Sequence, residues 1–177
     1  MLKSRLCIAF FAFAVGCAPA QKPLTDYVNP MLGTATLWDS VDLGFKPTKR
    51  TWGAEVFPGS SHPNAMVQVS PVTKFHSGAG YQYEDSVIYG FTHTNKGHWN
   101  LCHIPLLPVT GTPTPGDYCS PFSHERESAA PGYYQVFLDR YGVDAQLSST
   151  LRCAFHKYTY PAGAAASLLA DLQLSLI

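Results

Sequence analysis

A β-hairpin is predicted by Tyr133-Tyr134-Gln135-Val136-Phe137-Leu138, the turn Arg140-Tyr141-Gly142, and the alternating run Val143-Asp144-Ala145-Gln146-Leu147-Ser148-Ser149-Thr150. β-Branched and aromatic residues with a period of two are typical of strands that bury one face. The same alternation returns in 153–160 and ends at Pro161, and 166–172 supplies a last apolar strand. Successive strands at this spacing predict an all-β fold, an antiparallel β-sandwich.

The composition supports one folded domain. The chain has 177 residues, of which 46% are hydrophobic and only 14% are charged, and its formal net charge is zero. This length suffices for a sizeable core, and a low charge with many aromatic residues argues against disorder. Because there is no surplus of basic residues, nucleic acid is not expected as a partner.

Residues 1–20 have the pattern of a signal peptide, with a basic start, an apolar stretch and small residues before Ala20. Two processing routes remain open, namely cleavage after Ala20 and lipid attachment at Cys17 in a bacterial lipoprotein signal. We expect a secreted, periplasmic or outer-membrane lipoprotein, which would touch a membrane only through that lipid. Residues 21–177 are predicted to form the β-sandwich domain.

Three further cysteines lie in this domain, Cys102, Cys119 and Cys153. An odd number does not make a disulfide framework, although one bridge is feasible in an oxidising compartment. We expect at least one of them to be a buried free thiol.

The most polar stretch, residues 89–103, lies between two apolar runs and holds three histidines, two asparagines and one tryptophan. It predicts a strand, a loop turning near Gly97, and a second strand. Such a loop suits a sugar, whose hydroxyls bind Asn and His while its C–H face packs on Trp. The alternative is an ordinary hairpin loop whose polar side chains only meet solvent.

Other segments predict more strands and loops. Residues 24–34 are expected to be extended, 65–71 to form a strand that Pro71 ends, and 110–131 to form a proline-rich loop. Within that loop, residues 124–127 (His-Glu-Arg-Glu) lack the second histidine of a zinc-protease helix. They are interpreted as a polar loop whose carboxylates cap turns or pair with arginine.

No metal site and no catalytic residue is predicted within this chain. His93, His98 and His103 recur every five residues, which suits neither a helix-borne nor a strand-borne zinc site. A glycosidase needs two carboxyl groups facing one bond, and the sequence singles out no such pair. The acidic residues considered are Glu55, Asp85, Glu125, Asp139, Asp144 and Asp171.

Several motifs, in order, resemble glycoside hydrolase family 92, the bacterial exo-acting α-mannosidases. The resemblance runs from about residue 26 to 171. Its motifs are Asp26 to Thr34, Phe57-Pro58-Gly59, Met66 to Pro71, Gly80-Tyr81, Ile88 to Thr94, Leu107-Pro108-Val109, Ser123-His124-Glu125, Pro131 to Tyr134 and Arg152 to Pro161.

This resemblance implies an N-terminal β-sandwich that packs on a larger C-terminal helical toroid. It also implies hydrolysis of terminal α-mannosides with inversion, aided by calcium, with the carboxylates and the calcium site on the toroid. The partners implied are a mannose-containing glycan and that toroid. Because the toroid is not in this sequence, we expect a fragment that binds no calcium and is inactive alone.

The loop after Thr94 departs from the family's pattern. We expect it to face the sugar, with substrate-binding residues His93, Asn95, His98, Trp99 and Asn100. Two alternatives stay open at this stage: a free-standing carbohydrate-binding β-sandwich, and a remnant without function.

Overall fold

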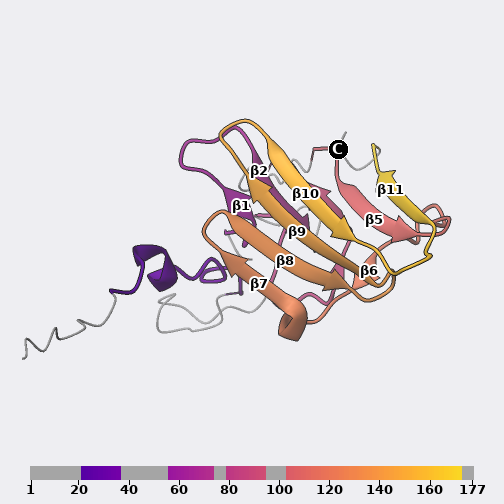
Figure 1. The fold of residues 1–177 in the computed structure, drawn as a ribbon, viewed down its shortest axis with the longest axis horizontal. Coiled ribbons are helices and arrows are strands. Elements are labelled where there is room, and N and C mark those ends of the chain that lie inside the picture. The colour runs from indigo at the N-terminus through magenta and orange to yellow at the C-terminus, as the bar shows by residue number, and fades with distance from the viewer. Residues whose placement is uncertain (1–20, 37–55, 74–78, 95–102, 173–177) are drawn as a thin grey trace, which may run out of the picture.

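The computed structural model describes residues 21–36, 56–73, 79–94 and 103–172. Two antiparallel sheets face each other (Figure 1), as the sequence predicted. The five-stranded sheet has the order β1-β2-β4-β5-β11, and the four-stranded sheet has the order β10-β9-β8-β7. The first comprises β1 (Ser60–Ser61), β2 (Gln68–Val72), β4 (Gly90–Thr92), β5 (Leu106–Thr110) and β11 (Ala166–Ala170). The second comprises β7 (Glu127–Ala130), β8 (Tyr133–Leu138), β9 (Val143–Ser149) and β10 (Ala154–Thr159).

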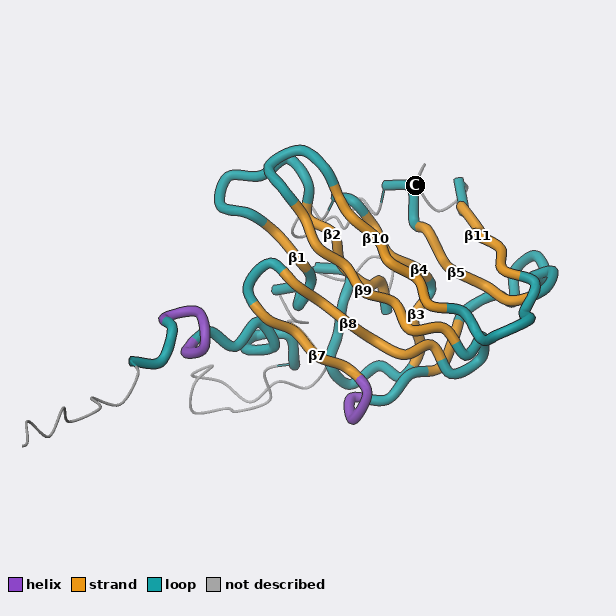
Figure 2. The backbone as a smooth tube through the Cα atoms, in the orientation of Figure 1, coloured by secondary structure: helices purple, strands orange, loops and turns teal. Residues whose placement is uncertain are grey.

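Short elements complete the fold (Figure 2). A two-stranded ribbon pairs β3 (Val87–Ile88) with β6 (Ser120–Pro121). Two short 3₁₀ helices are also present: η1 (Leu24–Tyr27) comes before β1, and η2 (His124–Arg126) directly precedes β7. In the part of the chain that the structure describes, no helix has the length and apolar character needed to span a membrane.

The predicted hairpin of residues 133–150 is confirmed. The alternation of buried and partly exposed residues along its strands shows which face packs against the core. Tyr134, Val136 and Leu138 of β8 are buried, and so are alternate residues of β9, while the residues between them are partly exposed. β9 packs across the sandwich against β1, β2 and β5. The buried residues of the five-stranded sheet that meet them include Val69, Phe91, Leu107 and Val109.

The predicted strand, loop and strand around residues 89–103 is confirmed at both ends. β4 and β5 pair antiparallel, with Phe91 opposite Leu106. The expected turn at Gly97 lies outside the described residues.

Three local predictions were wrong. Residues 24–27 form η1 rather than an extended segment. Pro71 lies inside β2 opposite Phe91, because β1 pairs only with Gln68 and Val69 and leaves that edge open at Pro71. The segment 110–131 holds β6, η2 and β7, because β7 hydrogen-bonds to β8 along its whole length.

The thiols of Cys119 and Cys153 are both free, with Cys119 half-buried and Cys153 exposed. The expectation of a fully buried free thiol is therefore not met by either of these two. Cys17, Cys102 and the predicted signal segment 1–20 lie outside the described residues.

Candidate functional site

Of the five predicted sugar-binding residues, His93 is the one within the described part of the chain. Asn95, His98, Trp99 and Asn100 lie outside it, so their roles stay predictions. His93 directly follows β4, and its backbone carbonyl accepts a hydrogen bond from the Gln68 amide at 3.0 Å. That bond fixes the backbone of His93 at the end of the β2–β4 pairing, just before the polar loop begins.

The imidazole of His93 meets that of His156 across the sandwich. Their Nε2 atoms lie 3.1 Å apart, the ring centroids are 4.9 Å apart, and the ring planes are inclined by 37°. His93 follows a strand of the five-stranded sheet, whereas His156 lies in β10 of the four-stranded sheet. The pair therefore bridges the two layers.

Strand β10 presents His156 through its alternation. Ala154, His156 and Tyr158 are half-buried and point inward, while the residues between them are exposed. The Tyr158 hydroxyl lies 2.7 Å from Nδ1 of His156, and its ring stacks on Phe91 with centroids 6.2 Å apart. The core thus fixes Tyr158, and Tyr158 in turn fixes the His156 ring.

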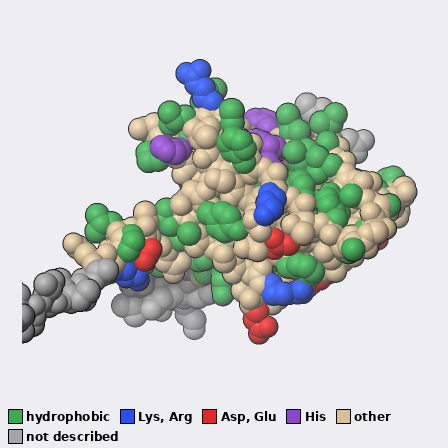
Figure 3. Space-filling model, viewed as in Figure 1, with side chains coloured by type: hydrophobic (Ala, Val, Ile, Leu, Met, Phe, Trp, Pro, Cys, Tyr) green, Lys and Arg blue, Asp and Glu red, His purple; other side chains and the backbone are tan. Residues whose placement is uncertain are grey.

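The site is open on one side. Both His93 and His156 are only half-buried, because β10 is the edge strand of its sheet. Figure 3 shows histidine side chains gathered at this edge, between β10 and the start of β5, with hydrophobic side chains on both sides. The hydroxyl of Thr94 lies 2.8 Å from Nδ1 of His103, so the two residues that flank the polar loop are in contact.

Burial keeps both imidazoles neutral. It lowers the pKa of His156 to about 4, with repulsion from His93 as a second cause. Burial also lowers the pKa of His93, although a hydrogen bond with the backbone of Ile104 opposes this. A neutral imidazole offers one N–H donor and one nitrogen acceptor, and the two rings use theirs on each other, on the Tyr158 hydroxyl and on the backbone of Ile104.

Sequence reasoning missed His156 and Tyr158 as site residues. The alternation in residues 153–160 placed them on one face, and a histidine on the inward face of a strand was a usable signal. Their pairing with His93, which is 63 residues away, depends on the sandwich.

A second polar cluster surrounds Glu127, whose side chain is only 2% exposed. The hydroxyls of Tyr81 and Tyr134 donate to its carboxylate, and Nδ1 of His124 lies 2.5 Å from it. Nε2 of His124 lies 2.7 Å from the carbonyl of Tyr83, so both ring nitrogens face acceptors. These hydrogen bonds hold η2 and β7 against the core, which indicates a structural role for the cluster.

The polar turn predicted for residues 124–127 is confirmed, but its cap is a serine and its ion pair joins the segment's arginine to an acid outside the segment. η2 is a single turn with Ser123 as its N-cap, and Arg126 forms an ion pair with Asp139. Glu127, however, leaves the turn and enters the core.

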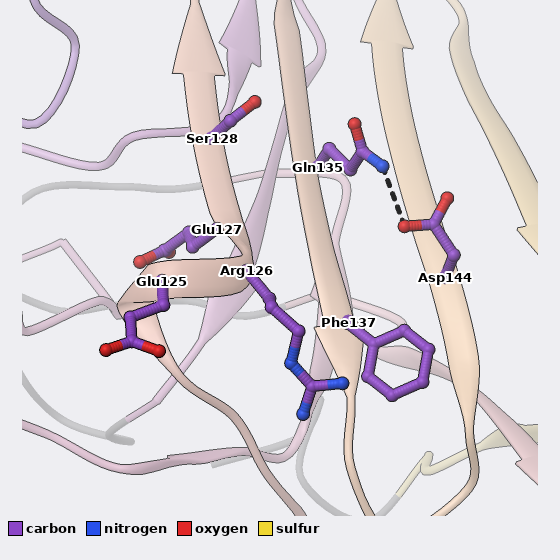
Figure 4. A pocket seen from close by; sticks show the side chains of 7 residues that line it. All are labelled: Glu125, Arg126, Glu127, Ser128, Gln135, Phe137 and Asp144. Carbon is purple, nitrogen blue, oxygen red and sulfur yellow. Dashed lines mark hydrogen bonds between the residues drawn. The ribbon is translucent and has the colours of Figure 1, made fainter.

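A shallow groove of about 340 Å³ on the outer face of β7–β9 is another candidate (Figure 4). Phe137 could offer a sugar platform there, but the guanidinium of Arg126 already lies 4.2 Å from its ring centroid. Gln135 donates to Asp144, as the dashed line shows. The ring of Phe137 and the Gln135–Asp144 pair of this groove are thus engaged with other groups of the protein.

The described carboxylates do not form a calcium cage. No group of three or more His, Cys, Asp or Glu side chains converges within the described ranges, whereas calcium takes six to eight oxygen ligands. Asp85, Asp139, Asp144 and Asp171 accept hydrogen bonds from Thr73, Arg126, Gln135 and Tyr118 respectively. Glu55 lies outside the described residues.

Comparisons with protein families and with solved structures point to the same family. Residues 27–176 match the glycosyl hydrolase family 92 N-terminal domain. A family GH92 α-mannosidase from Bacteroides thetaiotaomicron, solved with mannoimidazole, is 31% identical with a TM-score of 0.72. An inverting GH92 mannosidase from the same species is 26% identical with a TM-score of 0.66. The glycosyl hydrolase ccman5 is 29% identical with a TM-score of 0.65.

The chain aligns with these structures over 84–86% of its own length and with 20% of theirs. It therefore spans about a fifth of the solved enzymes that it matches. No curated protein matches the sequence.

Proposed function

The chain belongs to glycoside hydrolase family 92 and carries the N-terminal domain of its mannosidases, and on that premise we propose that it is the sugar-contacting part of an α-mannosidase. The enzyme would hydrolyse terminal α-mannosides of glycans with inversion. The observation that carries the proposal is the match over 85% of this chain with one fifth of a solved α-mannosidase.

The described residues supply contacts rather than bond cleavage in this proposal. An inverting glycosidase needs an acid and a base roughly 6.5–9.5 Å apart. The buried carboxylate of Glu127 is held by two phenols and an imidazole, which suits a structural role. The half-buried His93 and His156 would instead contact sugar hydroxyls by exchanging the hydrogen bond that now joins their Nε2 atoms. We place the catalytic carboxylates and the calcium ion on the C-terminal toroid, which is the partner of this domain.

Activity measurements test this division of labour. The 177-residue chain should not hydrolyse p-nitrophenyl α-mannoside in the presence of calcium. Clear turnover by this chain would contradict the proposal.

Ligand binding distinguishes the free-standing carbohydrate-binding module. Half of a sugar site loses most of its affinity, so calorimetry with mannose and mannobiose should detect at most weak, millimolar binding. Tight binding by the chain alone would favour the module instead.

We further propose export through the segment 1–20, with lipid on Cys17 as the route that would anchor the enzyme to a membrane. Metabolic labelling with a fatty acid tests it. Label that persists in a Cys17→Ala variant would overturn lipidation at this residue.

A further inference from the structure

Another groove, of about 490 Å³, lies beside η2 and has an aromatic lining. This Tyr83 groove is lined by the rings of Tyr83, Phe122 and His124. The rings of Tyr83 and His124 stack with their planes inclined by only 6° and their centroids 4.0 Å apart, and Phe122 meets His124 edge-on at 5.3 Å. Phe122 is buried, whereas Tyr83 is 40% exposed. The groove therefore offers an accessible aromatic ring that two other rings support.

Hydrogen bonds around Tyr83 hold its ring in place before any ligand binds. The Tyr83 amide donates to the carbonyl of Thr34 at 3.0 Å, and the Tyr83 carbonyl lies 2.7 Å from Nε2 of His124. Nδ1 of His124 lies 2.5 Å from the buried carboxylate of Glu127, which fixes the ring on which Tyr83 stacks. A ligand that packs on an already ordered ring loses less free energy to conformational ordering.

Polar groups at the rim of the Tyr83 groove are available to a ligand. Within the described part of the chain, the hydroxyls of Tyr83 and Ser86 and the carboxylate of Glu125 form no hydrogen bond. Figure 4 shows the carboxylate of Glu125 pointing away from Phe137. A hydroxyl can donate and accept, and an ionised carboxylate is a strong acceptor. An aromatic ring beside such groups suits a neutral sugar, which presents a C–H face and hydroxyls.

The Tyr83 groove is remote from the pair of His93 and His156. η2 directly precedes β7, and β7 and β10 are the two opposite edges of the four-stranded sheet (Figure 2). Strands spaced about 4.8 Å apart place these two edges roughly 14 Å from each other. A single sugar ring cannot span that distance, so the two places would contact different sugar residues.

We propose that the Tyr83 groove binds a neutral hexose of the glycan, apart from the sugar that the enzyme cleaves. The side chains of Glu84, Asp85 and Glu125 line the groove and give it three carboxylates. They disfavour an anionic sugar, because like charges repel. The inference rests on the proposed function, which supplies the glycan, and the groove would hold one part of that glycan while hydrolysis takes place at another.

Amide NMR spectra of the isotope-labelled 177-residue chain, titrated with mannobiose, test the proposal. The amides of Ser86 and Glu125 should shift and saturate with a dissociation constant in the millimolar range. These shifts should be lost in Tyr83→Ala and kept in Tyr27→Ala. Tyr27 is the matched control, because it is an exposed tyrosine of η1 that does not line the groove. Equal shifts in both variants, or no shifts at the groove of the unsubstituted chain, would overturn the proposal.

A second variant decides the matter if Tyr83→Ala fails to fold. Glu125→Ala removes an exposed side chain, so the fold should persist while the dissociation constant rises about threefold or more. An unchanged dissociation constant would count against the groove. Shifts confined to residues 89–94 would overturn the groove and leave the mannosidase proposal standing. Shifts at the groove, together with a full-length enzyme that does not cleave mannosides, would do the opposite.

Discussion

Tyr81 donates its phenolic hydroxyl to both carboxylate oxygens of Glu127, at 2.9 and 3.0 Å, although the two residues are 46 positions apart. Burial and the charge of Glu127 raise the pKa of Tyr81, so the phenol stays protonated and remains a donor. Together with Tyr134, it satisfies a carboxylate that has almost no contact with solvent. This contact joins the segment before β3 to β7 of the four-stranded sheet.

Removing a donor from Glu127 should destabilise the domain. Tyr134→Phe is expected to lower the free energy of unfolding by about 1.5–3 kcal/mol, because hydrogen bonds to a buried charged group are strong. Urea unfolding measures the change. Tyr133→Phe is the control, since its hydroxyl donates to Gln135 on the outer face and the loss should stay near 0.5–1 kcal/mol. Equal losses in the two variants would show that Glu127 is not held as described.

A methyl group at Gly59 should be poorly tolerated. A Cβ there would lie 2.1 Å from the carbonyl oxygen of Val69 and 2.6 Å from Cα of Ser70, and both are backbone atoms of β2. We expect Gly59→Ala to cost more than about 2 kcal/mol, measured by the thermal unfolding midpoint. Gly111→Ala is the comparison, because Gly111 has open space around it and only its positive φ of 76° opposes a side chain. Its cost should stay near 1 kcal/mol.

Stability should rise with pH through the titration of His156. The folded-state pKa is lowered to about 4 by burial and by His93, while the unfolded chain titrates near 6.5. Between these values the unfolded state binds the extra proton, so stability is complete above pH 6.5 and is lost as the pH falls toward 4. Because the ring is partly exposed, we expect a loss on the order of 1–2 kcal/mol.

Urea midpoints at pH 7 and pH 5 measure this loss. His156→Gln should be less sensitive to pH across the same window. An unchanged dependence in that variant would mean that other groups cause it.

The local stability of β11 should depend on the phenol of Tyr118. The hydroxyl of Tyr118 donates to Asp171 at 2.6 Å, just beyond β11, and the Asp171 amide donates to Pro105. Tyr118→Phe should speed hydrogen exchange of the β11 amides severalfold, with little change in β8 and β9. Uniform acceleration in all strands would point to global destabilisation instead.

Local patterning was enough to predict the sandwich. The period-two alternation of residues 133–160 specifies which side chains enter the core, and a strand needs no distant partner to show that pattern. The same logic failed for 110–131, where prolines suggested a loop. β7 forms there because β8 is available to pair with it and because the core accepts Glu127.

The candidate site was predictable only in part. Composition pointed to the loop after β4, and so to His93, whereas the other four predicted residues lie outside the described chain. His156 and Tyr158 became site residues only when the two sheets packed face to face. Side-chain periodicity is a property of neighbouring residues, but the meeting of His93 with a ring 63 positions away is decided by how the layers stack.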